Sequence, residues 1–324
     1  MRKMKTLNDL LPEGIRTVAI AGHVNPDGDC VGSTSALYLY LKKTHPELAL
    51  SLYLARPTDD LMFMDVMKEV SFEEPAPWSP DLLITCDTSS LDRIGCGAGL
   101  FETAKRTLSI DHHVSNTRYA DETWVEPDAS SCAEVLFYLF EEDKIDLPIA
   151  TALYTGLIHD TGVFQYSNVT RRTMEAGARL IGMGVPYTRI IEESFNAATF
   201  GQQRILGWCL ETSRLYLDGR VVASVCTQND MARFGVEAKD TGSVVAVIRQ
   251  TTGVELALFL YETEPGTFKL SLRSNSFLNV AELAARYGGG GHVKAAGATL
   301  KGSAPDLLAE VLKTAAAMLE ESDV

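Results

Sequence analysis

The 324-residue sequence has little positive charge, no long apolar run and no paired cysteine spacing. Its 29 Lys and Arg residues face 43 Asp and Glu residues, which gives a formal net charge of −14. Proteins that grip long duplex nucleic acid usually present a basic face, because phosphate neutralisation dominates their affinity. The charge balance therefore argues against a long duplex partner. It favours a small phosphorylated ligand or a very short oligonucleotide.

Apolar runs long enough to cross a membrane are also missing. A spanning helix needs roughly 18 or more consecutive apolar residues, and no stretch approaches that length. The basic start, Met1 to Lys5, is not followed by an apolar signal core. The six cysteines lack paired spacing, which is typical of reduced thiols. We therefore expect no membrane partner and a cytoplasmic location.

Four acidic or histidine-bearing clusters stand where apolar runs end in the first half of the chain. They are His23 to Asp29, Asp87, Asp111-His112-His113, and His159 to Gly162. Short apolar runs that alternate with helix-length segments are typical of parallel strands in an α/β sheet. Ligands bind outside the carboxyl ends of such strands. We therefore expect all four clusters to converge on one edge of the sheet.

If these clusters converge, four carboxylates lie close together and need a positive counter-charge. The carboxylates are Asp27, Asp29, Asp87 and Asp160. Like charges at close range cannot all stay ionised without a cation among them, and Arg and Lys are scarce in these clusters. Two divalent metal ions would balance the charge, with His23 and His112 as neutral nitrogen ligands. Oxygen-rich ligation with one imidazole per metal suits Mn²⁺ and admits Mg²⁺, Co²⁺ or Fe²⁺.

Paired metals of this kind generate a nucleophile from water and clamp a phosphoryl group. The sequence therefore predicts a two-metal phosphoesterase. Any one of these aspartates alone would more often be a turn former or a helix cap. Four clusters that each end an element favour the functional interpretation.

The elements expected along the chain form two lobes joined by a helical segment. In the first lobe, strands are expected at 17–22, 48–55, 81–87 and 106–111, and helices at 30–43, 60–70, 129–142, 148–159 and 170–183. In the second lobe, strands are expected at 221–226, 254–261 and 267–272, and helices at 242–250, 280–287 and 305–319. We expect an α/β fold: an N-terminal parallel-sheet domain with flanking helices that binds the metals (1–185), a helical linker (186–215), and a smaller C-terminal α/β domain that binds substrate (216–324).

The second lobe contains four consecutive glycines followed by a histidine, from Gly288 to His292. Glycine backbone lets amides approach an anion closely and form a binding nest. Upstream, Arg273 and Ser274 end a strand, where a guanidinium grips phosphate with two hydrogen bonds. The plainer alternative is a flexible loop with a helix-capping glycine. The adjoining His292 and the Arg-Ser pair favour substrate binding.

Taken in order, the motifs of the first lobe resemble those of the DHH phosphoesterase superfamily. Gly288 to His292 with Arg273-Ser274 resembles the associated DHHA1 domain. The combination most resembles the bifunctional oligoribonuclease and 3′-phosphoadenosine-5′-phosphate (pAp) phosphatase subgroup, the NrnA-like nanoRNases.

The resemblance implies a role for each motif residue. It implies one Mn²⁺ held by His23, Asp27 and Asp87, and a second held by Asp29, Asp87, His112 and Asp160. It implies that His113 faces the substrate and that Asp111 orients a neighbouring imidazole, as the two catalytic side chains. The implied substrate-binding residues are Arg273, Ser274, Gly289, Gly290, Gly291 and His292. One departure is His159, which is either an extra group outside the metal ligands or a histidine at a helix C-terminus.

The implied activity is Mn²⁺-dependent hydrolysis of short single-stranded RNA and linear dinucleotides to mononucleotides, and dephosphorylation of pAp. The attacking group would be a metal-bridging hydroxide, in line with the leaving oxygen. A homodimer is compatible with this interpretation. Two alternatives stay open: a pyrophosphate or polyphosphate hydrolase of the same superfamily, and a non-catalytic nucleotide- or RNA-binding module. The scarcity of Lys and Arg near Arg273 argues against the first, and the complete ligand set argues against the second.

Overall fold

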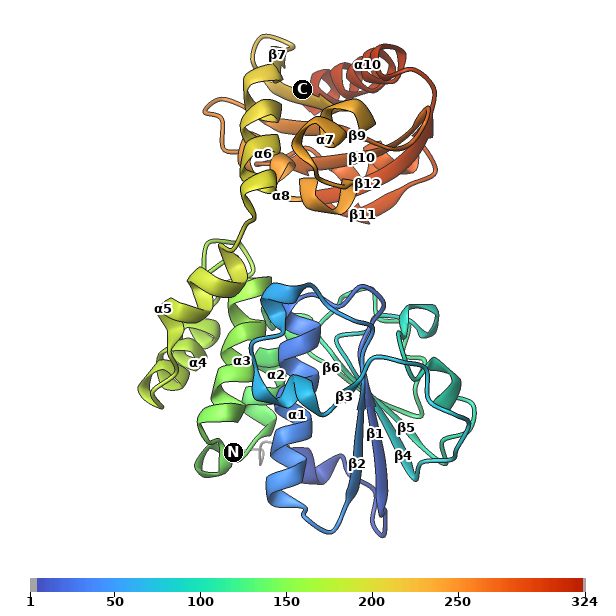
Figure 1. Ribbon diagram of the computed structural model, residues 1–324, viewed down its shortest axis with the longest axis vertical. Helices are drawn as coiled ribbons and strands as arrows, with labels where there is room; N and C mark the ends of the chain where they lie inside the picture. Colours follow the sequence, from blue (N-terminus) through green and yellow to red (C-terminus); the bar gives the residue numbers. More distant parts are fainter. Residues whose placement is uncertain (1–4, 323–324) are drawn as a thin grey trace. The chain divides into compact units, whose positions relative to one another are not determined.

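The computed structural model describes residues 5–322, and it divides into two compact units between Ala197 and Ala198 (Figure 1). This division falls inside the segment expected to be a helical linker. Helix α5 (Tyr187–Ile190) and the π-helical turn Ile191–Phe195 pack on the first unit, whereas α6 (Phe200–Thr212) packs on the second. The helical segment is therefore shared between the units. Among the described residues, no helix is both long and apolar enough to cross a membrane.

The first unit is built on six parallel strands in the order β3-β2-β1-β4-β5-β6. Their bounds are β1 Thr17–Ala21, β2 Ala49–Tyr53, β3 Val70–Ser71, β4 Leu82–Cys86, β5 Thr107–Asp111 and β6 Glu122–Val125. The chain runs outward from β1 to β3 and then returns to add β4 on the other side of β1. In such sheets the ligand site lies at this reversal, outside the carboxyl ends of β1 and β4.

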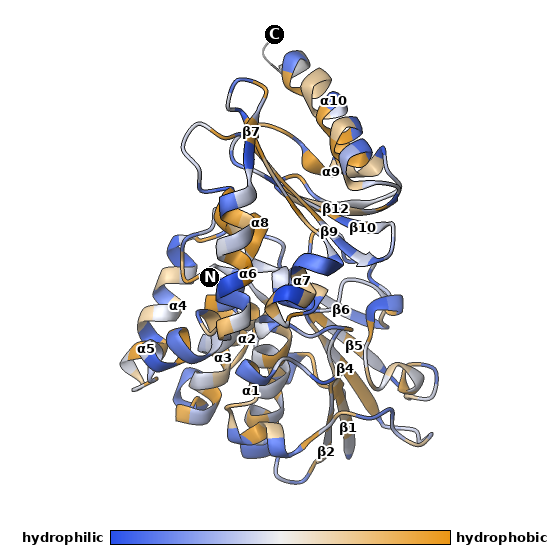
Figure 2. Cartoon of the chain, turned by 45° about the horizontal axis from the view of Figure 1, so that its top comes forward, coloured by the Kyte–Doolittle hydropathy of each residue, from blue (hydrophilic) through white to orange (hydrophobic). Residues whose placement is uncertain are grey.

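Helices cover one face of this sheet, and short turns cover the other. The helices are α1 Gly28–Thr44, α2 Cys132–Leu139, α3 Leu147–Asp160 and α4 Arg171–Gly182. Alternation along β1 sends Val18 and Ile20 into the core with the helices, and Ala19 into a smaller cluster with Leu100. Apolar residues accordingly line the central strands on both sides (Figure 2). Burial on both faces explains why these strands read as continuous apolar runs.

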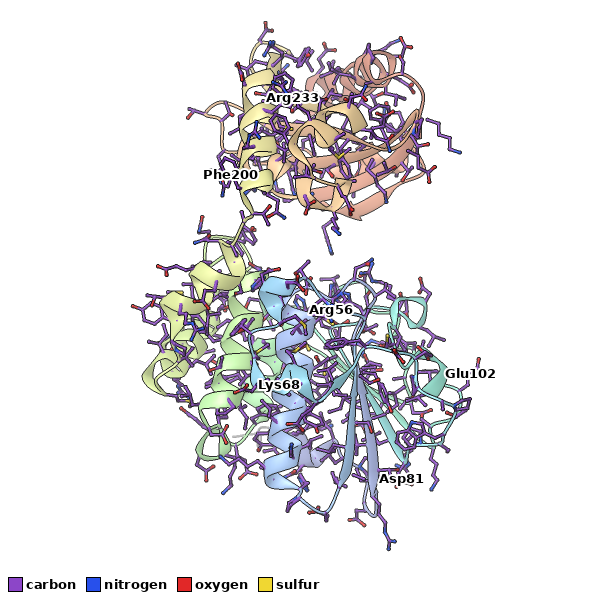
Figure 3. The ribbon with its side chains drawn as sticks, in the orientation of Figure 1. Arg56, Lys68, Asp81, Glu102, Phe200 and Arg233 are labelled. Atoms are coloured by element: carbon purple, nitrogen blue, oxygen red, sulfur yellow. The ribbon has the colours of Figure 1, made fainter. Side chains whose placement is uncertain are left out.

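The two edges of the sheet carry different side chains at the strand ends. Asp81 directly precedes β4 and marks the amino-terminal edge, while Arg56 follows β2 and marks the carboxyl edge (Figure 3). The Asp81 carboxylate accepts hydrogen bonds from the backbone N–H groups of Arg16 and Thr17, 2.9 and 3.0 Å away. The amino-terminal edge is therefore closed by structural hydrogen bonds, and the predicted ligands all lie at the other edge.

The second unit contains a mixed sheet in the order β11-β12-β10-β9-β8-β7, in which only β8 and β9 run parallel. The strands are β7 Arg214–Tyr216, β8 Val221–Cys226, β9 Leu256–Glu264, β10 Thr267–Ser274, β11 Gly290–His292 and β12 Ala295–Lys301. Helices α9 (Val280–Ala285) and α10 (Ala304–Ser322) pack on one face. On the other face, α6, α7 (Gln228–Phe234) and α8 (Ser243–Ile248) cover β8 and β9.

The predicted α/β class is confirmed, but several elements differ from expectation. The helix expected at 60–70 is wrong: two 3-10 turns, Asp59–Leu61 and Asp65–Lys68, are separated by the extended backbone of Met64. Strands β3, β6, β7, β11 and β12 were not expected. The sequence of β12 is rich in Ala and Gly, which are depleted in strands, and pairing with β10 along its whole length makes it a strand.

Close packing of α1 on α3 depends on a glycine at position 32. A Cβ atom there would lie 2.5 Å from the Ala152 carbonyl oxygen and 2.6 Å from the Gly156 nitrogen. We expect Gly32→Ala to lower the free energy of unfolding by about 1–3 kcal/mol, because the helices must separate. The measurement is the urea midpoint. The control is Gly182→Ala at the end of α4, where nothing lies within 4 Å. A Gly32→Ala midpoint equal to that of the control would show that the contact is not tight.

Candidate metal centre and nucleotide-binding residues

The structure brings together the six side chains predicted to bind metal. His23 and Asp27 lie between β1 and α1, and Asp29 lies in the first turn of α1. Asp87 and His112 directly follow β4 and β5. The fourth cluster ends a helix rather than a strand, since Asp160 is the last residue of α3. All six nevertheless meet at the carboxyl edge of the sheet.

Asp87 occupies the middle of this group. Its Oδ2 lies 3.4 Å from His23 Nε2, and its Oδ1 lies 3.5 Å from both His112 Nε2 and His113 Nδ1. The side chain is only 3 % exposed, and Oδ1 has no hydrogen-bond partner among the described residues. Its backbone φ of 54° is a left-handed value that strains a non-glycine residue. A buried carboxylate oxygen without a donor costs free energy, so this position fits a cation.

The two imidazoles on either side of Asp87 present the same ring nitrogen to the carboxylates. His23 Nδ1 donates to the carbonyl of Val24 at 2.7 Å, and His112 Nδ1 donates to the carbonyl of Ala129 at 3.3 Å. Each Nε2 is then the nitrogen with a free lone pair. His112 Nε2 is buried without a hydrogen-bond partner among the described residues. This tautomer is the one that binds metal through Nε2.

The remaining carboxylates complete the surroundings of these nitrogens. Asp27 Oδ1 lies 3.7 Å from His23 Nε2. Asp160 Oδ2 and Asp29 Oδ2 lie 3.1 and 3.9 Å from His112 Nε2. The arrangement thus has two halves that share Asp87. His23, Cys30 and Asp87 form one group with ligand atoms close enough together to hold a metal ion. Asp29, His112 and Asp160 form another.

The electrostatics of the cluster also fit a divalent cation. Burial raises the pKa of Asp29 well above its ordinary value, and the charges of Asp87 and Asp160 raise it further. Burial likewise raises the pKa of Asp160. Burial lowers the pKa of His112, but its contacts with Asp160 and Asp87 outweigh burial and raise it well above normal. Without a metal, protons bind to the cluster and reduce the repulsion between its carboxylates. Metal binding would release these protons.

Cys30 adjoins the cluster but is a poor ligand. Its sulfur accepts the His23 backbone N–H at 3.3 Å. Burial raises the pKa of the thiol to about 12, so it stays protonated near neutral pH. Only the thiolate is a strong metal ligand.

His113 is held differently from His112. Its Nδ1 donates to Asp111 Oδ1 at 2.8 Å, and Asn116 Nδ2 donates to Asp111 Oδ2 at 2.6 Å. Burial raises the pKa of Asp111, but the hydrogen bonds and charges of His113, Asn116 and His112 together outweigh burial and lower the pKa. The His113 side chain is 28 % exposed, against 14 % for His112. Asp111 therefore orients His113, whose Nε2 stays available to a ligand.

Local structure explains how Asp29 and Asp160 are positioned. Asp29 accepts hydrogen bonds from the N–H groups of Cys132 and Ala133, 2.6 and 2.9 Å away, at the N-terminus of α2. Asn168 Nδ2 donates to the Asp160 carbonyl at 3.0 Å. Neither Asn116 nor Asn168 was anticipated from the sequence. Their only signal is an asparagine a few residues after a ligand-bearing motif.

His159 packs against the start of α1. A Cβ at Gly28 would lie 2.1 Å from His159 Cγ, so only glycine fits over the ring. His159 Nε2 lies 3.2 Å from Ser194 Oγ, and burial lowers the pKa of the imidazole. His159 is thus a partly buried packing residue next to Asp160.

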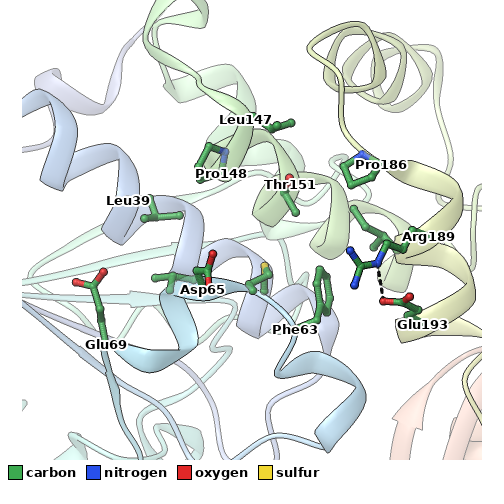
Figure 4. A pocket seen from close by; sticks show the side chains of 13 residues that line it. Leu39, Phe63, Asp65, Glu69, Leu147, Pro148, Thr151, Pro186, Arg189 and Glu193 are labelled. Carbon is green, nitrogen blue, oxygen red and sulfur yellow. Dashed lines mark hydrogen bonds and ion pairs between the residues drawn. The ribbon is translucent and has the colours of Figure 1, made fainter.

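A separate apolar cavity of about 380 Å³ lies in the first unit (Figure 4). Leu39, Phe63, Leu147 and Pro148 line it, and the ion pair of Arg189 with Glu193 closes one side. Leu39 follows Asp29 by ten residues on α1, which is about 15 Å along the helix. The cavity is therefore distinct from the carboxylate cluster.

In the second unit, Arg273 and His292 lie in one row across the sheet. Arg273 of β10 is opposite Ala295 of β12, which is opposite His292 of β11. Directly opposite residues place their side chains on the same face. Only the small side chain of Ala295 stands between them in this row. From Gly290 the glycine run is a strand paired with β12, so the alternative of a flexible loop does not apply there.

Ser274 has a structural role. Ser274 is 1 % exposed, and its hydroxyl donates to the Glu255 carboxylate at 2.9 Å. Glu255 also accepts the backbone N–H groups of Phe277 and Leu278, 2.9 and 2.8 Å away. The carboxylate thereby holds the turn that follows Arg273. Neither Glu255 nor this buried position of Ser274 was anticipated, and a lone acidic residue before an apolar strand was the only signal.

Comparison with known proteins agrees with this architecture. The DHH family model for the N-terminal domain matches residues 17–157, and the DHHA1 domain model matches residues 218–321. A protein of Thermus thermophilus named bifunctional oligoribonuclease and PAP phosphatase NrnA is 31% identical over 93% of this chain and 89% of its own length. The Bacillus subtilis protein of the same name is 28% identical over 88% and 89%.

A solved structure described as an exopolyphosphatase-related protein from Bacteroides fragilis shares the fold. It has a TM-score of 0.83 and 24% identity, and the match covers 93% of this chain and 91% of that one. The two domain matches and the 31% identity with the Thermus thermophilus protein show that the chain belongs to the DHH family and carries a DHHA1 domain after its DHH domain.

Proposed function

We propose that this protein is a Mn²⁺-dependent phosphoesterase that hydrolyses short oligoribonucleotides to mononucleotides and dephosphorylates pAp. The names of the two relatives support this substrate class. The observation that carries the proposal is the Asp87 carboxylate, buried between three imidazoles with one oxygen unpartnered among the described residues.

Two divalent ions would share Asp87 in this proposal. His23, Asp27 and Asp87 would hold one, and Asp29, Asp87, His112 and Asp160 would hold the other. Bound there, they would supply an activated water nucleophile and neutralise charge on the phosphoryl group. The amides of α2 fix Asp29 before any metal binds. The side chain of Asp87 is only 3 % exposed, so packing restricts the carboxylate that the two ions would share.

His113 would act on the substrate rather than on the metals. Burial lowers its pKa, but the hydrogen bond to Asp111 and the charge of Asp87 raise it to a net value above normal. A protonated imidazole with Nε2 available can stabilise phosphate charge or protonate the leaving oxygen. Asp111 keeps the proton on Nδ1 and so fixes the ring orientation.

The DHHA1 unit would bind the nucleotide through Arg273 and His292, which share a sheet face. The backbone of Gly290 and Gly291 would line the same site, and Gly289 would border it. Ser274 would position Arg273 through its hydrogen bond to Glu255 and would not contact the nucleotide itself.

The direct test of the substrate class uses three substrates, each with Mn²⁺ and then with EDTA. They are a 5′-labelled RNA dinucleotide, pAp and pyrophosphate. We expect Mn²⁺-dependent mononucleotide from the dinucleotide and phosphate from pAp. Cleavage of pyrophosphate alone would instead identify a phosphoanhydride hydrolase, and no turnover at all would favour a binding module.

Replacing the shared carboxylate should uncouple both metals. We expect Asp87→Asn to reduce dinucleotide turnover to background and to weaken Mn²⁺ binding measured by calorimetry, because the amide removes the negative charge. Asp92→Asn serves as the control, since Asp92 is exposed shortly after the same strand. Near-normal turnover of Asp87→Asn would exclude a shared ligand at this position.

Substitution of the two adjacent histidines should affect different quantities, metal affinity for His112 and kcat for His113. His112→Gln is expected to raise the Kd for Mn²⁺. His113→Gln should leave that Kd unchanged while kcat falls by about 10²–10⁴-fold, the usual contribution of a positioned acid or base. Titration calorimetry and steady-state kinetics on the dinucleotide measure the two effects. Equal losses of metal affinity in both variants would contradict the division of roles.

Arg273 should affect substrate binding more than chemistry. A charge-assisted contact to phosphate contributes about 1.5–3 kcal/mol, so Arg273→Ala is expected to raise KM about 10–100-fold with little change in kcat. Arg273→Lys should have a KM between those of the wild type and Arg273→Ala, because an ammonium group lacks the planar pair of donors of a guanidinium. The exposed Arg286 of the same unit provides the control, Arg286→Ala. A loss confined to kcat would show that Arg273 acts in another step.

A further inference from the structure

The row that contains Arg273 is one end of a longer polar face on the second sheet. Lys269 of β10 is opposite Thr299 of β12, and Ser271 is opposite Gly297. Alternate residues of a strand lie on the same face, so these side chains share the face of Arg273. The intervening Leu270 and Leu272 pack into the core with α10. We call this surface the polar sheet face.

The charge of the polar sheet face is opposite to that of the chain. Along β10 and β12 its positions carry two lysines and one arginine, Lys269, Lys301 and Arg273, and no carboxylate. Acidic residues outnumber basic ones by 43 to 29 in the whole sequence. A face with basic residues and no carboxylate along these two strands is suited to an anionic ligand.

A hollow lies at the Lys269 end of this face. Tyr261, Lys269, Ser271, Gly288, Gly289 and Thr299 are among the residues that line it, and neither Arg273 nor His292 is. Gly289 passes so close to β12 that a Cβ would lie 2.2 Å from the Gly297 carbonyl oxygen. The glycine run therefore forms one wall of the hollow without side chains to fill it.

Tyr261 supplies an aromatic ring beside the ammonium group. It stands on β9 directly opposite Lys269. Its ring stacks on Phe259 with centroids 5.4 Å apart and 23° between the planes, which fixes its position, and it remains partly exposed. An aromatic ring that accepts a base, next to a cation that contacts the backbone, is how proteins bind single-stranded nucleic acid.

We propose that this hollow is a subsite for an additional nucleotide of an oligoribonucleotide. Lys269 contacts a backbone phosphate and Tyr261 stacks on the base. The inference rests on the proposed function and extends it from the terminal nucleotide to its neighbour. Lys269 lies four residues from Arg273, about 13 Å along the strand. That separation sets the hollow apart from the Arg273 row, so pAp, with a single nucleoside, does not occupy it.

The test compares a pentaribonucleotide with pAp in the Lys269→Gln variant of the full chain. We expect KM for the RNA to rise several-fold and KM for pAp to stay unchanged. The exposed Lys313 of α10 gives the control, Lys313→Gln, which should alter neither. Tyr261→Leu should also raise KM for RNA alone, whereas Tyr261→Phe should retain stacking and behave as wild type. Equal changes for RNA and pAp, or no change for either, would overturn the subsite.

A binding measurement keeps this test independent of catalysis. Fluorescence anisotropy of a labelled pentaribonucleotide in EDTA gives Kd for the wild type and for Lys269→Gln at several salt concentrations. Loss of one phosphate contact should weaken binding and reduce the slope of log Kd against log salt by about 0.7. Unchanged Kd and slope would overturn the subsite even if the protein cleaves RNA. A weakened Kd in a protein that cleaves nothing would support the subsite and reject the proposed activity.

Discussion

Repulsion among carboxylates buried at one edge of a parallel sheet is the constraint on which the first unit depends. Asp29, Asp87 and Asp160 lie within reach of one imidazole, His112, and burial raises the pKa of both Asp29 and Asp160. Such a cluster is tolerable only with protons or metal ions among the oxygens. The fold keeps these groups together at a cost in stability, which is the usual sign of a functional site.

The surrounding structure is arranged to hold that cluster in place. Amides at the start of α2 bind Asp29, the left-handed turn after β4 presents Asp87, and carbonyl groups select the tautomers of His23 and His112. Glycines at the α1–α3 crossing let the helices approach until a Cβ at Gly156 would lie 2.7 Å from Asp29. A buried carboxylate also holds a turn in the second unit. Glu255 accepts hydrogen bonds from the Ser274 hydroxyl and from backbone N–H groups of the turn after Arg273.

The central sheet and the carboxylate cluster could be predicted well from the sequence, because both arise from local patterns. Apolar runs that end in Asp or His marked β1, β4 and β5, and the reversal of strand order then put their ends together. Other features depend on tertiary pairing. Strand β12 has weak strand propensity and exists through its pairing with β10, and the inward position of Ser274 depends on a hydrogen bond to Glu255, 19 residues earlier in the chain. Asn116 and Asn168 act through hydrogen bonds to Asp111 and Asp160 that residue spacing does not predict.

The central claim is that Asp87 is shared by two metal ions. Electron paramagnetic resonance of the Mn²⁺-loaded protein tests it most directly, together with the metal content after gel filtration. The account predicts two Mn²⁺ per chain with the spectrum of an exchange-coupled pair. One Mn²⁺ per chain, or two with the spectrum of isolated ions, would contradict a shared carboxylate.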